Sequence, residues 1–128
     1  MITPLPEPLG TVVVVDDHAG FRRAVRELLT AAGWQIVGEA STAAAGLDLI
    51  ARLAPDVVLL DVVLPDMDGF AVAGRLAATG SASSVVLTSG HDRCDFEGRL
   101  RAAPVRGFLP KELISGRALA ALLAGDRG

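Results

Sequence analysis

Short apolar runs alternate along the chain with segments in which apolar residues recur at helical spacing. Each run has the length and β-branched content of a buried parallel strand, and the alternation is the βαβ pattern. We therefore predict five strands, each followed by a helix. The strands are expected at residues 12–15, 35–40, 56–60, 85–88 and 107–110, and the last three helices at 70–78, 93–102 and 115–123.

Polar residues, glycine and proline indicate where the helices begin and end. The first helix is expected to stop at Gly33, because glycine suits the position just after a helix. Ser41 is placed to N-cap the second helix, Pro55 to end it, and Ser115 to N-cap the last. The inward faces of the first two helices are expected to contain Phe21, Val25, Leu28, Leu29, Leu47, Ile50 and Leu53.

The predicted fold is α/β, with an open, doubly wound, five-stranded parallel sheet of the flavodoxin-like kind. Five βα units are too few for a closed eight-stranded barrel, and the expected strand order is 2-1-3-4-5. A chain of 128 residues, 51% of them hydrophobic, fits one domain with its own core. The domain is expected at residues 11–124, between an extended, proline-containing tail at 1–10 and a short tail at 125–128.

Polar residues that suit catalysis follow four of the five expected strands. Asp16 and Asp17 follow the first strand and Asp61 the third, Thr88 ends the fourth, and Lys111 follows the fifth. Because the strands are parallel, all five residues fall on one rim of the sheet. The first and third strands are neighbours at the topological switch point, where such folds bind ligands. Three carboxylates are therefore expected to share one pocket.

A cluster of three carboxylates predicts a bound cation. Two carboxylates about 4 Å apart repel by roughly 4 kcal/mol at an effective dielectric constant of 20, so the cluster must take up protons or a cation. Oxygen ligands favour Mg²⁺, which also binds phosphate oxygens. In that pocket Asp61 would be the nucleophile, Lys111 the opposing cation, and the Thr88 hydroxyl a hydrogen-bond donor to a phosphoryl oxygen.

Each of these residues also has an ordinary structural interpretation. Asp16 or Asp17 could N-cap the first helix, Asp61 could be a turn residue, Thr88 could bond the backbone, and Lys111 could be solvated. Their coincidence on one rim favours a functional site.

Other polar residues receive no chemical role. Asp56 begins the third strand at the opposite edge of the sheet and is expected to be a solvated turn residue. Asp66 and Asp68 are expected to shape the loop after Asp61, while His18 and His91 lack partners at ligand spacing.

Composition excludes several classes of protein. The net charge is −3 and the twelve Lys and Arg residues are scattered, which argues against direct nucleic-acid binding. No apolar run approaches the roughly 18 residues of a membrane helix. No GxGxxG or Walker pattern occurs, which argues against a nucleotide cofactor. A single cysteine, Cys94, cannot form an intrachain disulfide and suits a reducing cytosol, so a cytoplasmic location is expected.

Four stretches together resemble the receiver domains of two-component response regulators. They are VVVVDDH, VVLLDVVLPDMDGF, VVLTSG and GFLPK, and the resemblance spans residues 11–123. It implies that Asp61 accepts a phosphoryl group and takes part in a Mg²⁺ site. The other implied metal-site residues are Asp17, the backbone carbonyl of Val63, and Asp16, which acts mainly through metal-bound water.

The resemblance also implies a switch. Thr88 and Lys111 would contact the phosphoryl group, and Phe108 matches the aromatic residue that turns inward when the threonine moves; an ordinary core residue is the alternative for Phe108. Many receivers carry a proline in a cis peptide where Glu112 stands, which leaves the Lys111–Glu112 peptide undecided. Pro104 is another departure, at the expected end of the fourth helix.

The function implied is a phosphorylation switch, not an enzyme acting on other substrates. A sensor histidine kinase or a phosphotransfer protein would donate the phosphoryl group. The surface formed by the fourth helix, fifth strand and fifth helix would then change shape and bind a downstream protein or a second copy of the chain. A stand-alone receiver is the first expectation, because the chain ends five residues after Leu123.

Three alternatives stay open. One is a receiver cut from a longer DNA-binding regulator. Another is a phosphohydrolase of the haloacid-dehalogenase type, which needs an acid two residues after its nucleophile, where Val63 stands. The last is a flavin-binding module, although the chain has no tyrosine and one tryptophan to stack on a flavin.

Overall fold

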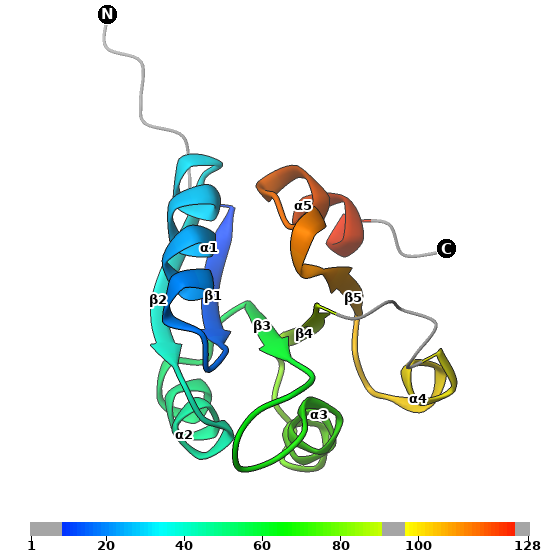
Figure 1. Cartoon of the computed structure of the whole chain (residues 1–128). Helices are drawn as coiled ribbons and strands as arrows, with labels where there is room; N and C mark the ends of the chain where they lie inside the picture. Colours follow the sequence, from blue (N-terminus) through cyan, green and yellow to red (C-terminus); the bar gives the residue numbers. More distant parts are fainter. Residues whose placement is uncertain (1–8, 91–96, 125–128) are drawn as a thin grey trace, which may run out of the picture.

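A computed structural model describes residues 9–90 and 97–124 of the chain. The expected terminal tails therefore lie outside the described residues, apart from Leu9 and Gly10, and Gly10 is already the first residue of β1. Strands and helices alternate along the chain (Figure 1). They are β1 (Gly10–Val15), α1 (Ala19–Ala31), β2 (Trp34–Ala40), α2 (Ala43–Leu53), β3 (Val57–Asp61), α3 (Gly69–Ala78), β4 (Ser84–Ser89), α4 (Glu97–Ala102), β5 (Gly107–Pro110), a 3₁₀ turn (Lys111–Leu113) and α5 (Gly116–Ala124).

The five strands form one parallel sheet in the order β2-β1-β3-β4-β5. This confirms the predicted fold class and strand order. From β1 the chain first adds β2 on one side and then β3 on the other side. The carboxyl ends of β1 and β3 are therefore adjacent at the topological switch point.

Helices cover both faces of the sheet and bury two separate cores (Figure 1). Successive side chains of a strand point to opposite faces. In β1, Val13 and Val15 accordingly pack with residues of α2 and α3, whereas Val12 and Val14 pack with residues of α1 and α5. Every residue of β3 is buried, which explains why the central strands appear as unbroken apolar runs.

Several helix boundaries agree with the sequence predictions. Gly33 follows α1 with a φ of +105°, a conformation that favours glycine. The Ser115 hydroxyl accepts a hydrogen bond from the Ala118 N–H at 3.0 Å and caps α5. The described part of α4 ends at Ala102, as expected, while its expected start at residue 93 lies outside the described residues.

Three local predictions were wrong. Thr42, not Ser41, caps α2, because the Thr42 backbone is extended and its hydroxyl accepts from the Ala45 N–H at 3.1 Å. Leu28 and Leu53 are 49% and 42% exposed, so the buried faces of α1 and α2 are narrower than the apolar pattern suggests.

Asp56 is more than a solvated turn residue. Its carboxylate accepts hydrogen bonds from the backbone N–H and the hydroxyl of Thr11, at 2.9 and 3.1 Å. The Thr11 hydroxyl in turn accepts from the Asp56 N–H at 2.9 Å. These bonds join the starts of β1 and β3. No helix among the described residues is long and apolar enough to cross a membrane.

The start of α3 packs directly on the backbone at the end of β3. A Cβ atom at Gly69 would lie 2.5 Å from the backbone oxygen of Asp61 and 3.0 Å from the Cα of Val62. We therefore expect Gly69→Ala to destabilise the fold by about 1–3 kcal/mol, the usual cost of overpacking. Gly74→Ala is the matched control on the same helix, because a Cβ there meets nothing within 4 Å.

The control should raise stability by about 0.4–1 kcal/mol, since alanine restricts the unfolded chain more than glycine does. Urea denaturation of the two variants would measure both changes. Equal stabilities for the two variants would show that the close approach at Gly69 is relieved at no cost.

Candidate functional site

Three carboxylates meet where the carboxyl ends of β1 and β3 lie side by side. Asp16 and Asp17 follow β1, and Asp61 is the last residue of β3. One ligand atom from each of these residues and from His18 lies within 4.8 Å of the others. Asp16 and Asp61 are buried, whereas the Asp17 side chain is 40% exposed. The predicted carboxylate cluster is therefore present, and it includes His18, for which no chemical role was predicted.

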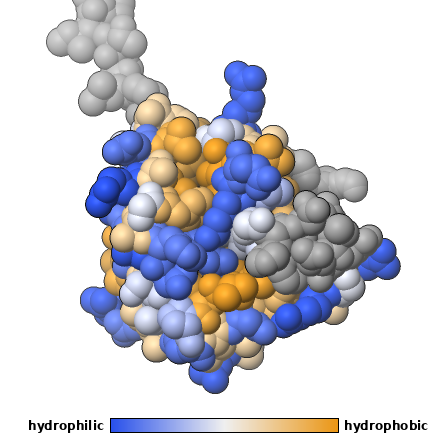
Figure 2. All heavy atoms as spheres, viewed as in Figure 1, coloured by the Kyte–Doolittle hydropathy of each residue, from blue (hydrophilic) through white to orange (hydrophobic). Residues whose placement is uncertain are grey.

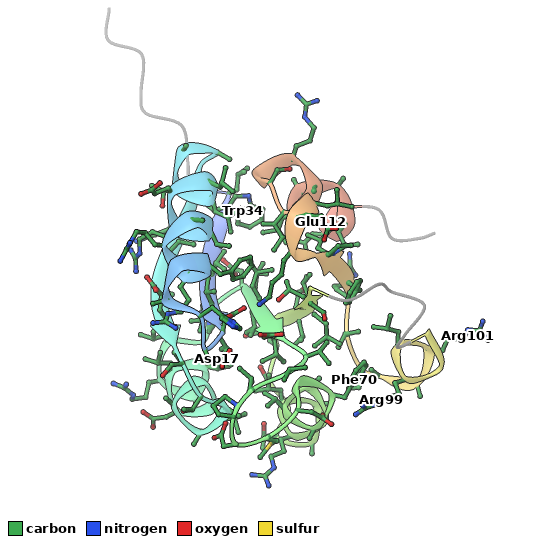
Figure 3. The ribbon with its side chains drawn as sticks, viewed as in Figure 1. Asp17, Trp34, Phe70, Arg99, Arg101 and Glu112 are labelled. Atoms are coloured by element: carbon green, nitrogen blue, oxygen red, sulfur yellow. The ribbon has the colours of Figure 1, made fainter. Side chains whose placement is uncertain are left out.

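Figures 2 and 3 place this cluster on the molecule. Asp17 lies near the end of β1, and Trp34 lies far from it at the other end of the sheet (Figure 3). On the face in view, hydrophilic residues separate two areas of apolar side chains (Figure 2). A cavity of about 630 Å³ lies elsewhere, between α2 and α3, and none of the carboxylates of the cluster lines it.

Asp16 is held by its neighbours on α1 and β2. Its Oδ1 accepts a hydrogen bond from the His18 backbone N–H at 2.8 Å. The guanidinium of Arg22 donates to the backbone carbonyl of Asp16 and also to the carboxylate of Glu39 on β2. Arg26 donates to the same Glu39 carboxylate. These arginines were not predicted to be part of the site, although Arg22 lies one helical turn after His18.

Lys111 supplies the positive charge of the site. Its Nζ lies 2.8 Å from Oδ2 of Asp16 and 3.2 Å from Oδ2 of Asp61. It also lies 4.6 Å from the centre of the Phe21 ring, within range of a cation–π interaction. Phe21 was expected to be a core residue of α1 and nothing more. The ring instead helps to hold the lysine over the two buried carboxylates.

The pKa values reflect this crowding. Burial raises the pKa of the Asp61 carboxyl above its ordinary value, and the negative charge of Asp16 raises it further. The Val63 N–H, 3.1 Å from Oδ1 of Asp61, and the Lys111 ammonium act in the opposite direction. Burial alone would lower the pKa of Lys111, but its contacts with Asp16 and Asp61 outweigh burial and raise it. A cation bound at the cluster would favour the ionised Asp61.

The remaining predicted residues lie around Asp61. Thr88 on β4 is buried and lies directly opposite Asp61 in the strand register. Val63 is 57% exposed beside the cluster. Phe108 on β5 is buried in the core shared with α3, one register position before Thr88. The Lys111–Glu112 peptide is trans, as the described residues contain no cis peptide bond.

Asp66 and Asp68 do more than shape their loop, since each caps a helix. Asp66 accepts hydrogen bonds from two N–H groups at the start of α2, at 2.8 and 3.0 Å, and these bonds lower its pKa. Asp68 caps α3 and bonds Arg99 of α4 at 2.8 Å, a contact that lowers the pKa of Asp68. Arg99 also lies 4.1 Å from the centre of the Phe70 ring (Figure 3). The loop after Asp61 is thereby connected to α2, α3 and α4.

The prediction that His18 lacks partners was wrong. Its Nδ1 lies 3.2 Å from Oδ1 of Asp16 and 3.1 Å from Oδ1 of Asp17. Its place immediately after the acid pair, where β1 leads into α1, is the signal that was available. His91 lies outside the described residues.

Comparison with known proteins identifies the family. The sequence model of the response regulator receiver domain family matches residues 12–123 of this chain. The chain belongs to this family. It is a phosphoacceptor switch of two-component signalling. Receiver domains interact with histidine kinases or phosphotransfer proteins, and they are signalling domains and not, in general, enzymes.

Curated relatives and solved structures agree with this assignment. The receiver domain is 37% identical over 129 residues to the probable transcriptional regulatory protein NarL of Mycobacterium tuberculosis, covering 100% of this chain and 59% of that protein. It is 36% identical over 120 residues to a putative transcriptional regulator of Pseudomonas aeruginosa, covering 91% of this chain and 58% of the relative. The chain thus spans about three fifths of the length of these relatives.

The solved receiver domain of the putative response regulator NarL from M. tuberculosis has the same fold. The TM-score is 0.82 at 36% identity, covering 94% of this chain and 100% of that one.

The described residues fit a small divalent cation. Three carboxylates converge, and Oδ2 of the buried Asp16 makes no well-aligned hydrogen bond, although it forms an ion pair with Lys111. An oxygen-rich cluster with a net negative charge is the kind of site that such ions occupy. The receiver domain therefore has a cluster that could hold a metal ion.

Proposed function

We propose that Asp61 accepts a phosphoryl group from a phosphohistidine of a sensor kinase or phosphotransfer protein. The observation that carries this proposal is that the buried Asp61 carboxylate contacts the Lys111 ammonium and belongs to one cluster with Asp16 and Asp17. Asp16, Asp17, Asp61 and the backbone carbonyl of Val63 would hold Mg²⁺. When bound, the ion would offset the charge of the carboxylates and of the incoming phosphoryl group.

The transfer is a displacement at phosphorus. A carboxylate oxygen of Asp61 forms a bond to phosphorus, and the phosphorus–nitrogen bond of the donor histidine breaks. The bonding electrons leave with the imidazole, which keeps or takes up a proton. Asp61 must be ionised to attack, and the Lys111 ammonium supports that state because it opposes the rise in the Asp61 pKa that burial causes.

Lys111 and Thr88 stabilise the product. The Lys111 ammonium, which bonds Asp61 at 3.2 Å, would move onto a phosphoryl oxygen, and the Thr88 hydroxyl would donate to another. Thr88 lies opposite Asp61 on the neighbouring strand, so a small movement suffices.

We infer that the output surface consists of α4, β5 and α5. Asp68, Arg99 and the Phe70 ring link the loop after Asp61 to α4, so a shift of that loop on phosphorylation would reach this surface. Phe108 on β5 would take part by changing its packing when Thr88 moves. A downstream protein or a second copy of the chain would bind there, and a cytoplasmic location agrees with such partners.

A second role is favoured by the relatives. Several are named as transcriptional regulators, and this chain spans about three fifths of their length. Control of a DNA-binding output is therefore our second proposal, while a stand-alone receiver stays a prediction. The phosphohydrolase alternative has little support, because Val63 stands where that reaction needs an acid.

Incubation with acetyl phosphate, followed by intact-mass measurement, tests the main proposal. We expect one phosphoryl group per chain in the presence of Mg²⁺ and none after the metal is removed with EDTA. An adduct that forms equally well without a divalent ion would contradict the proposed role of the carboxylates.

A further inference from the structure

We propose that His18 supplies an imidazole nitrogen to the carboxylate cluster and makes the site prefer first-row transition-metal ions, such as Co²⁺ and Ni²⁺, over Mg²⁺. The inference rests on the proposed function in one respect, namely that the carboxylates of Asp16, Asp17 and Asp61 are ion ligands. It adds a ligand and a selectivity to that site.

The position of the ring carries the inference. Nδ1 of His18 lies 3.2 Å from an oxygen of Asp16 and 3.1 Å from an oxygen of Asp17. With Asp61 included, four potential ligand atoms lie within 4.8 Å of one another. Ligands about 2.1 Å from a common ion can be at most about 4.2 Å apart, so a contraction of a few tenths of an ångström would bring all four into contact with one ion.

The surroundings allow that contraction. The His18 side chain is 69% exposed, and the polar contacts described for its ring are these two carboxylates. No core packing therefore fixes the ring elsewhere. Asp16, whose side chain is 1% exposed, presents its Oδ1 to His18, while its Oδ2 pairs with the Lys111 ammonium at 2.8 Å. The cluster thus combines a solvent-exposed nitrogen with a buried carboxylate, and an ion bound there would compete with Lys111 for that carboxylate.

The kind of ligand decides which ion benefits. Imidazole suits later first-row ions, whereas Mg²⁺ prefers oxygen and gives up its water reluctantly. A nitrogen from His18 would therefore strengthen the binding of Co²⁺ and Ni²⁺ and change that of Mg²⁺ little. Three carboxylates alone would distinguish these ions less.

Metal titrations of the whole chain test the proposal. Co²⁺ would be followed by its visible absorption and Mg²⁺ by competition against Co²⁺. In His18→Phe, which keeps a ring but loses the nitrogen, we expect the ratio of Co²⁺ to Mg²⁺ affinity to fall at least tenfold, or about 1.4 kcal/mol. In the wild type, the imidazole NMR signals of His18 should show large paramagnetic shifts with Co²⁺.

The controls separate this inference from the proposed function. His91→Phe tests the other histidine of the chain. An unchanged affinity ratio in His18→Phe, or a loss confined to His91→Phe, would overturn the assignment of His18. Because the His18 side chain is exposed, we expect His18→Phe to fold, and circular dichroism would confirm it. Adduct formation with acetyl phosphate is measured separately, so failure of phosphorylation would reject the proposed function without deciding the metal ligand.

Discussion

Replacing Asp61 by asparagine is expected to abolish the phosphoryl adduct. An amide lacks the anionic oxygen that must bond phosphorus, and the other two carboxylates of the cluster are less suited to the attack. The Asp17 side chain is 40% exposed, whereas Asp16, which also contacts Lys111, is fully buried and its Oδ1 accepts from the His18 N–H. The loss should therefore be complete, as judged by intact mass after incubation with acetyl phosphate and Mg²⁺.

Two controls make that result specific. The wild-type adduct should be removed by hydroxylamine and by base, because an acyl phosphate is a mixed anhydride that these nucleophiles cleave. Asp48→Asn changes a carboxylate on α2 that pairs with Arg52 in solvent, and it should leave the adduct at the wild-type level. A full-level adduct in Asp61→Asn would place the phosphorylated residue elsewhere.

The fold followed from the sequence because its strands are buried on both faces. Residues 57–60 and 12–15 are apolar without interruption, which few arrangements other than central parallel strands require. Once the strands are parallel and ordered 2-1-3-4-5, the residues after them must meet at one rim. The positions of Asp16, Asp17 and Asp61 were therefore predictable from topology alone.

The orientation of side chains was less predictable. Periodicity gives the direction of a helix face but not its width, so Leu28 and Leu53 were placed inside although both are exposed. His18 was discounted because ligand spacing was sought along one element, whereas its partners are the acids immediately before it. Phe21 was expected only to fill the core. Its contact with Lys111 was not predictable from local sequence, because it joins α1 to the residue that follows β5.

Replacing Asp17 or Lys111 by alanine should change Mg²⁺ affinity in different ways. Asp17→Ala removes an exposed oxygen ligand and a negative charge, so we expect Mg²⁺ binding to weaken at least tenfold, or about 1.4 kcal/mol. The phosphoryl adduct should be lost as a consequence. Calorimetric titration with Mg²⁺, together with intact mass, measures both effects, and Asp48→Ala is the carboxylate control.

Lys111→Ala should leave Mg²⁺ binding at least as tight as in the wild type. The ammonium lies 2.8 Å from Asp16 and 3.2 Å from Asp61, so it competes with a metal ion for the same carboxylates. Its removal therefore raises the negative potential that attracts the ion. The response to phosphorylation should nevertheless be lost, because the ammonium that would link a phosphoryl oxygen to the end of β5 is absent. Amide chemical shifts of α4, β5 and α5, compared with and without acetyl phosphate, would measure that response.

Equal loss of Mg²⁺ binding in Asp17→Ala and Lys111→Ala would mean that Lys111 is needed to build the ion site itself, and the proposed division of roles would be wrong.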